Sequence, residues 1–244
     1  MRETALVLLP GLDGSGVLFR PIMKHFPPGI RPIVMRFPSD RSLGYEELLP
    51  IVLGALPHEL PFVILGESFS GPLALMAASM RLPNLLGVVL CASFVRNPLR
   101  FRFGWMRYLV RPALFRLYPR FVLVRGILSK QSTSELRALA AEALVAISPT
   151  VLAHRVRAVM GVNVNSKLSS CAVPILYIRA KHDVVVGQRN LTEIQAACPS
   201  IQVACLDGPH AILQTQPAAA AAVIMAFVRN LLVSDNPALI APPM

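Results

Sequence analysis

The chain has 244 residues, of which 54 % are apolar and 15 % are charged, so it can bury a sizeable core as one large or two small domains. This composition excludes a disordered chain, a collagen and a coiled coil. The longest uninterrupted apolar run, Ala218–Val228, is far shorter than the roughly 20 residues that a membrane-spanning helix needs.

The N-terminus and the cysteines indicate where the chain resides. Only five apolar residues precede Pro10, which is too short a run for a secretory signal. The four cysteines lie far apart without a CxxC pair, so free thiols in a reducing cytoplasm are expected.

Short apolar strands alternate with helical stretches over most of the chain. Strands are expected at Ala5–Leu9, Arg31–Phe37, Phe62–Leu65, Val88–Cys91, Ile175–Ile178 and Ile201–Leu206. Helices are expected at Ser15–Lys24, Tyr45–Leu56, Phe69–Met80, Gln188–Ala197 and Ala218–Leu232. This alternation predicts an α/β fold with a mostly or all-parallel sheet of about six strands and helices on both faces.

Positive charge is concentrated in one segment. The net charge is +11, and residues 96–160 hold twelve basic and two acidic residues, leaving twelve basic and eleven acidic residues for the rest of the chain. Arginines alternate with aromatic residues in the first part of this segment, with no acidic residue between them. The shift in composition marks an inserted subdomain.

The insertion is expected to be helical. Ser132 and Glu135 form a capping-box pattern before a helix through Ala146, and Pro149 suits the first turn of a helix to Met160. Residues 96–165 are therefore predicted to be a basic helical cap, 1–95 and 166–233 the core, and 234–244 a loose tail with three prolines.

The main chemical motif follows the third expected strand. Apolar residues run directly into Gly66-Glu67-Ser68-Phe69-Ser70 and then into an apolar helix. A serine on a sharp strand-to-helix turn takes a strained backbone conformation that presents its hydroxyl above the sheet, and its flanking positions must be small. Ser68 is the predicted nucleophile, although the second small position is Ser70 rather than glycine. Without further context the motif also fits a helix N-cap.

Two partners for this serine follow in the required order. Asp183 comes just after the strand Ile175–Ile178, and His210 comes after the last strand. Loops after parallel strands share one edge of the sheet, so these side chains can converge with Ser68. The imidazole would then accept the serine proton, and the carboxylate would fix the imidazole's tautomer.

With these residues the chain resembles the α/β-hydrolases, specifically serine esterases and lipases. The resemblance spans nearly the whole length, with Leu6–Gly16 matching the oxyanion loop and residues near 96–165 the variable cap. It implies an oxyanion hole made by the backbone N–H groups of Leu12 and Phe69, each typically contributing about 2.7–4 kcal/mol to transition-state stabilisation. It also implies that the family's first two strands are missing here.

Other residues rank as lesser candidates. Trp105, Tyr108 and His154 in the cap are candidate pocket residues, and Asp13 and Asp207 are expected to fix turns. Glu67, beside the nucleophile, could tune the pocket, but a position facing solvent is expected. Histidines and acids form no metal-binding spacing, and neither a dinucleotide fingerprint nor a Walker lysine is present, so no metal and no cofactor are implied.

These observations predict a serine hydrolase that cleaves carboxylic esters with a hydrophobic acyl or alcohol part. A thioesterase or amidase with the same three residues is one alternative. Another is a catalytically silent hydrolase fold that binds lipid membranes through the cap. The basic cap itself fits a solvated cover, contact with an anionic lipid surface, or recognition of an anionic leaving group, with nucleic-acid binding ranked last.

Overall fold

The computed structural model describes residues 3–98, 104–117, 128 and 132–235. Six strands form one sheet in the order β2-β1-β3-β4-β5-β6, and every neighbouring pair is parallel. The strands are β1 (Thr4–Leu9), β2 (Ile30–Val34), β3 (Phe62–Glu67), β4 (Leu85–Cys91), β5 (Ile175–Ala180) and β6 (Gln202–Leu206). The predicted six-stranded, all-parallel α/β sheet is therefore confirmed.

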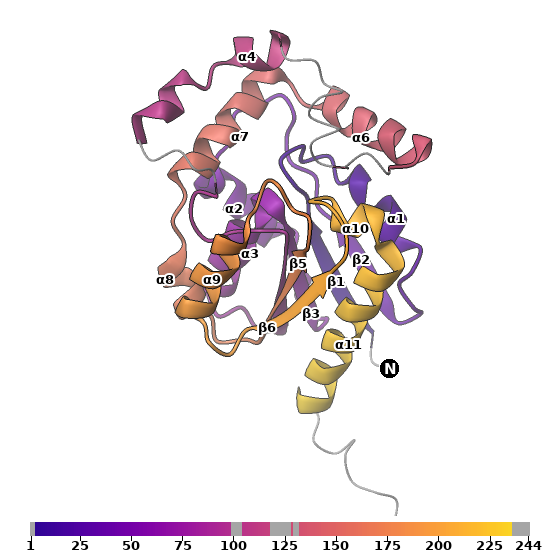
Figure 1. Cartoon of the computed structure of the whole chain (residues 1–244). Helices are drawn as coiled ribbons and strands as arrows, with labels where there is room; N and C mark the ends of the chain where they lie inside the picture. Colours follow the sequence, from indigo (N-terminus) through magenta and orange to yellow (C-terminus); the bar gives the residue numbers. More distant parts are fainter. Residues whose placement is uncertain (1–2, 99–103, 118–127, 129–131, 236–244) are drawn as a thin grey trace, which may run out of the picture.

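Helices cover both faces of the sheet (Figure 1). On one face lie α2 (Tyr45–Gly54), α3 (Gly71–Ala78), α8 (Asn165–Ser169) and α9 (Gln188–Ala197). On the other lie α1 (Arg20–Met23), α10 (Ile212–Thr215) and α11 (Pro217–Asp235). Short 3-10 turns, η1 (Val17–Phe19) and η2 (Ser68–Ser70), precede α1 and α3.

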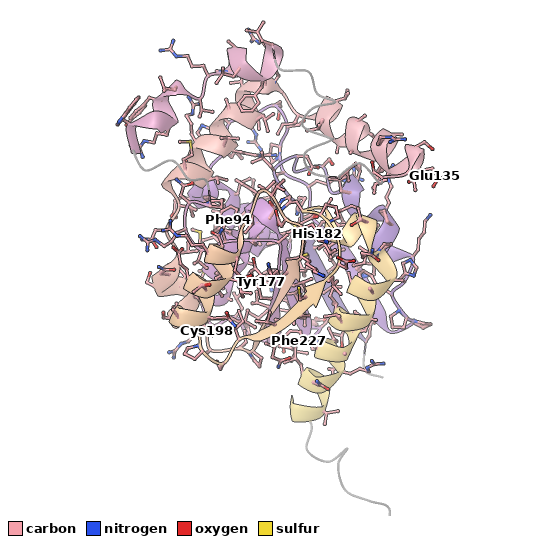
Figure 2. The ribbon with its side chains drawn as sticks, viewed as in Figure 1. Phe94, Glu135, Tyr177, His182, Cys198 and Phe227 are labelled. Atoms are coloured by element: carbon pink, nitrogen blue, oxygen red, sulfur yellow. The ribbon has the colours of Figure 1, made fainter. Side chains whose placement is uncertain are left out.

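Alternate residues of each strand supply two separate apolar cores. Val7, Ile64 and Tyr177 belong to the core under α2 and α3, whereas Leu8 and Leu65 belong to the core under α11. Tyr177 and Phe227, both labelled in Figure 2, thus mark the two layers. A parallel strand buried on both faces reads as a continuous apolar run, which is why the sequence pattern identified these strands.

Several predicted boundaries differ from the structure. β2 ends at Val34 rather than Phe37, and it tolerates Pro32 because it is an edge strand. The expected helix Ser15–Lys24 is divided into η1 and α1, and it begins only at Val17 because Gly16 has a φ of 73°, outside the helical region. The expected tail begins too early, because α11 continues to Asp235; residues 236–244 lie outside the described part.

Within the described ranges, helical elements of the predicted insertion lie beyond the carboxyl edge of the sheet (Figure 1). They are η3 (Gly104–Leu109), α4 (Pro112–Leu117), α6 (Ser134–Ala146) and α7 (Pro149–Gly161). Pro149 begins α7 as predicted, but the α6 cap is Thr133 rather than Ser132: the Thr133 hydroxyl accepts from the Leu136 N–H at 3.2 Å. The arginine-aromatic residues 99–103 and 118–127 lie outside the described residues.

The two ends of the insertion meet. Arg96 and Asn163 form an antiparallel bridge, and the Val164 N–H donates to the Val95 carbonyl at 2.8 Å. The chain thus leaves and re-enters the sheet layer at neighbouring points. The division into core and cap at residues 96 and 165 stays a prediction.

In the described ranges, no single helix is long and apolar enough to cross a membrane. Among the described helices, only α6 and α7 taken together have the length and apolar composition of a membrane span, and these two helices are bent by 94° relative to each other.

The packing of α11 on the sheet generates the first prediction. Phe227 is 2 % exposed, so Phe227→Ala should leave a cavity and lower the free energy of unfolding by about 3–5 kcal/mol. Urea unfolding followed by circular dichroism measures this loss. Val233→Ala on the same helix, where the side chain is 43 % exposed, should change stability by less than about 1 kcal/mol. Equal losses in both variants would contradict this packing of α11.

Candidate active site

Ser68 lies at a tight turn between β3 and α3. Its φ is 48°, in the left-handed region that non-glycine residues rarely adopt. A Cβ on Gly66 would lie 2.6 Å from the Ser70 carbonyl oxygen, so only glycine fits where strand and helix approach each other. The turn therefore has the strained geometry that the sequence motif predicted.

The structure explains the serine at position 70. The buried Ser70 hydroxyl donates to the carbonyl of Pro10, which ties this turn to the loop after β1. Gly71 provides the close approach instead, because a Cβ there would lie 1.9 Å from the Ser93 Oγ. The Ser93 hydroxyl in turn donates to the Ser68 carbonyl at 2.6 Å. Both serine contacts join distant segments, so the sequence pattern did not predict them.

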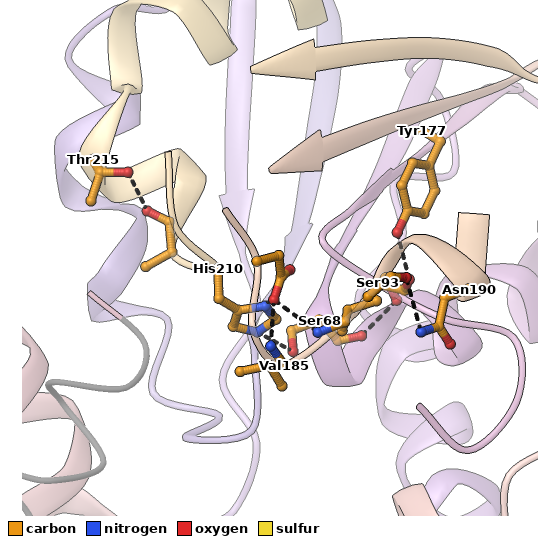
Figure 3. Close-up of polar contacts among 11 residues, drawn as sticks. Ser68, Ser93, Tyr177, Val185, Asn190, His210 and Thr215 are labelled. Atoms are coloured by element: carbon orange, nitrogen blue, oxygen red, sulfur yellow. Dashed lines mark hydrogen bonds and ion pairs between the residues drawn. The ribbon is translucent and has the colours of Figure 1, made fainter. Parts of the chain in front are cut away.

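Three predicted site residues form one hydrogen-bonded chain (Figure 3). The distance from His210 Nε2 to Ser68 Oγ is 2.9 Å, and the distance from His210 Nδ1 to Asp183 Oδ2 is 2.8 Å. The other oxygen of Asp183 accepts from the N–H groups of Val185 and Val186, both at 2.8 Å. The loop thus holds the carboxylate while one oxygen faces the imidazole.

Both side chains behind the serine are shielded from water, with His210 9 % and Asp183 4 % exposed. They follow β6 and β5 respectively, so the carboxyl edge of the sheet brings them to Ser68, which follows β3. In this arrangement His210 can take a proton from the Ser68 hydroxyl while Asp183 holds the opposite N–H.

The residues that carry the expected oxyanion donors lie in two backbone turns, one after β1 and one after β3. The Gly14 N–H donates to the Gly11 carbonyl, closing a turn around Leu12, and Asp13 accepts from the Ser15 N–H at 2.8 Å. Asp13 therefore fixes this turn as expected. Phe69 lies in the first turn of η2, where N–H groups have no intrahelical acceptor. The role of these two N–H groups stays a prediction.

A pocket of about 240 Å³ opens at Ser68. Leu12, Ser68 and His210 line it at the sheet edge. The insertion supplies apolar walls from Phe115, Leu128, Ala140, Ala143, Leu144, Leu152 and Val156. Asp13, Glu67 and Gln214 also line the pocket at the sheet edge, so it is apolar on the side of the insertion and polar close to Ser68.

The three cap candidates lie elsewhere. Trp105 and Tyr108 on η3 are 58 % and 64 % exposed, and neither lines the pocket. His154 lies beside Gly44, with its Nε2 3.6 Å from where a Cβ on Gly44 would be. These expectations differ from the structure because helix rotation decides which cap residues turn inward, and sequence spacing did not reveal it.

Glu67 is buried rather than facing solvent. Its Oε1 accepts from Gln214 Nε2 at 2.8 Å, while Glu67 Oε2 and Gln214 Oε1 have no hydrogen-bond partner in the described part. Burial raises the pKa of Glu67 to about 7, with nearby Asp13 adding to the rise. Val63, Leu65 and Glu67 share a face of β3, so strand alternation could have indicated this burial.

Two further findings concern Asp207 and possible metal ligands. Asp207 Oδ1 and His182 Nε2 lie 2.8 Å apart in an exposed side-chain hydrogen bond, rather than in the backbone turn that was expected. Across the ranges that the structure describes, no three His, Cys, Asp or Glu side chains gather as they would around a metal ion.

Glu67 generates a prediction about pH. The folded chain keeps a proton on Glu67 that the unfolded chain releases above about pH 4.5. Its contribution to stability is therefore fully present below pH 4.5 and falls by about 3 kcal/mol as the pH rises to about 7. Glu67→Gln should remove this fall, as measured by urea unfolding at pH 5, 6, 7 and 8.

The exposed Glu46→Gln serves as the control and should keep the pH profile of the wild type. If Glu67→Gln and the wild type lose the same stability between pH 5 and 7, the buried carboxyl is not the source of this dependence.

Solved structures share this fold over nearly the whole chain. They include a lipase-esterase related protein from Clostridium acetobutylicum ATCC 824 (16 % identity, TM-score 0.75, covering 93 % of this chain and 95 % of that chain). They also include the enol-lactonase from Burkholderia xenovorans LB400 (15 % identity, TM-score 0.76, covering 94 % of this chain and 92 % of that chain). A third is an esterase from Exiguobacterium antarcticum (14 % identity, TM-score 0.75, covering 93 % of this chain and 92 % of that chain). At such identities the likeness establishes the fold alone.

The sequence itself matches a family model. No curated protein sequence matches the chain. The model described as serine aminopeptidase, S33, matches residues 50–213, about two thirds of the chain, including Ser68, Asp183 and His210. The chain therefore belongs to the serine aminopeptidase S33 family of hydrolases, within the α/β-hydrolase superfamily.

Proposed function

We propose that this protein is a serine hydrolase that cleaves carboxylic esters with a small hydrophobic acyl or alcohol part. The observation that carries the proposal is the hydrogen-bonded chain Ser68–His210–Asp183 opening into an apolar pocket. The pocket volume of about 240 Å³ is smaller than the roughly 300–1,000 Å³ of pockets that hold drug-sized ligands, and this favours a small acyl group.

The reaction follows from the positions of these atoms. Ser68 Oγ attacks the ester carbonyl carbon while His210 Nε2 accepts its proton, and the carbonyl oxygen becomes an oxyanion. The N–H groups of Leu12 and Phe69 stabilise that charge. His210 gives the proton to the departing alcohol, leaving an acyl group on Ser68. A water molecule, deprotonated by His210, then releases the acid and restores the serine.

A thioester or amide would follow the same steps with a thiol or amine as the leaving group. A panel of p-nitrophenyl esters of increasing acyl length, with matched thioesters and anilides, ranks these substrates by kcat/KM. The apolar pocket favours esters over charged or peptide substrates.

The nucleophile assignment gives the next prediction. Ser68→Ala should lower kcat for p-nitrophenyl acetate by at least about 10⁴-fold, because the acyl-enzyme no longer forms. The same change should abolish covalent labelling by a fluorophosphonate. Ser70→Ala, in the same turn but pointing at the Pro10 carbonyl, should still be labelled at Ser68. Wild-type turnover in Ser68→Ala would falsify the assignment.

A specific surface supports a second candidate function, docking on an anionic lipid membrane. We call it the η3–α4 surface: Trp105, Arg107, Tyr108, Leu109, Arg111, Leu114, Arg116 and Leu117. All eight side chains are exposed, with Leu117 83 % exposed, and no acidic residue interrupts residues 96–134. Interfacial binding typically combines two contacts: aromatic and leucine side chains enter the lipid surface, and arginines beside them contact the anionic headgroups.

Charge neutralisation tests this candidate. Changing Arg107, Arg111 and Arg116 to Gln should weaken binding to phosphatidylserine vesicles by roughly 100-fold, since each basic residue contributes about 1 kcal/mol. Sedimentation at low and high salt measures the binding, which should survive Ser68→Ala. The matched control changes the exposed Arg31, Arg81 and Arg229 to Gln. Equal weakening in both triple variants would show general charge attraction and contradict docking through this surface.

A further inference from the structure

A buried arginine links the insertion to the loop after β1. Arg155 on α7 is 0 % exposed, and its Nη1 donates to the Leu12 carbonyl while its Nη2 donates to the Pro38 carbonyl, both at 2.9 Å. Gly14, with a φ of 71°, leaves room for it: a Cβ there would lie 2.3 Å from Arg155 Nη1. The guanidinium thus lies directly against the loop backbone.

The same guanidinium also lies close to Phe69, the residue that carries the second expected oxyanion donor. Its central carbon lies 6.0 Å from the ring centroid of Phe69 and 5.7 Å from that of Phe37. Phe69 is further fixed by Tyr45, whose ring stacks on it at 4.7 Å. One side chain therefore contacts both residues, Leu12 and Phe69, whose N–H groups are expected to stabilise the oxyanion.

Burial of this cation is energetically unfavourable. In the described part of the chain Arg155 forms no ion pair within 4 Å, and its Nε has no hydrogen-bond partner. Burial lowers its pKa to about 10, with the nearby charge of Asp13 partly opposing the fall, so it remains charged at neutral pH. An apolar side chain of similar size would fill the space at lower desolvation cost, so packing alone does not account for arginine here.

Arg155 does not line the pocket, and both of its donated hydrogen bonds go to main-chain carbonyls. It therefore acts on bound substrate only through the residues that it holds. Hydrogen bonds from a charged donor are stronger than those from a neutral one, which suits the fixing of a short loop.

We propose that Arg155 is a positioning residue for the oxyanion hole: by holding the Leu12 carbonyl and the face of Phe69, it sets the two N–H groups at the spacing that a tetrahedral intermediate requires. The insertion thereby completes the catalytic centre that it covers. This inference rests on the proposed ester hydrolysis.

The proposal predicts that replacing Arg155 weakens stabilisation of the transition state and leaves binding of the substrate nearly unchanged. An oxyanion hole that is misplaced binds the ground-state ester almost as before, so kcat falls while KM changes little. Removal of one donor from such a hole lowers kcat by about 10²–10³-fold, which sets the upper limit for a displaced donor.

The experiment compares Arg155→Met, Arg155→Lys and the control Arg157→Met, which changes a partly buried arginine on the same helix. Arg155→Met should lower kcat for p-nitrophenyl acetate by about 10–100-fold with KM within about threefold. Its affinity for a trifluoromethyl ketone, which forms a tetrahedral adduct with the serine, should fall by the same factor. Arg155→Lys keeps the charge and should retain an intermediate rate, and Arg157→Met should match the wild type.

A measurement independent of turnover accompanies these rates. Amide hydrogen exchange in the peptide spanning residues 11–16 should be faster in Arg155→Met than in the wild type. If the Met variant does not fold, the Lys variant decides by the same measurements.

Two outcomes overturn the proposal. One is wild-type kcat and ketone affinity in the folded Arg155 variants, even if their melting temperature falls, because the role would then be structural only. The other is unchanged exchange of the loop. If the wild-type protein hydrolyses no acyl substrate, ester hydrolysis itself fails, and loop exchange alone still decides whether Arg155 holds the loop.

Discussion

The close approach of β3 and α3 is the constraint from which the rest of the site follows. Gly66 and Gly71 lie where added Cβ atoms would collide with the Ser70 carbonyl and the Ser93 side chain. The turn between them places Ser68 at a φ of 48° at the carboxyl edge of the sheet. Such strain persists only where surrounding contacts over-determine it. Here those contacts are the Ser93 bond to the Ser68 carbonyl and the Ser70 bond to Pro10.

Parallel topology then brings distant residues to that turn. Because β3, β5 and β6 run in the same direction, the loops after them reach one edge, and Asp183 and His210 meet Ser68 without any contribution from local sequence. Among the described residues near this site, the buried Glu67 and Arg155 each have a polar atom that lacks a hydrogen-bond partner. Buried groups of this kind destabilise a fold and gather at functional sites, which agrees with their place beside the serine and the loop after β1.

The insertion has two faces with different chemistry. Its inward residues, such as Leu152 and Val156, make the pocket apolar, and Arg155 reaches the loop after β1 from the same helix. Its outward residues on η3 and α4 combine exposed arginines with exposed aromatic and leucine side chains. A single helical segment therefore shapes the substrate space on one side and presents a basic, apolar surface on the other.

The sequence by itself determined the sheet and the identity of the three interacting side chains. Strands buried on both faces appear as continuous apolar runs, and the order serine, aspartate, histidine after successive strands implies their convergence. Only the tertiary structure decided which cap residues turn inward, that Gln214 donates to Glu67, and that Arg155 reaches Leu12. These contacts join segments up to 147 residues apart, and helix rotation and packing set them, so neither local propensity nor periodicity encodes them.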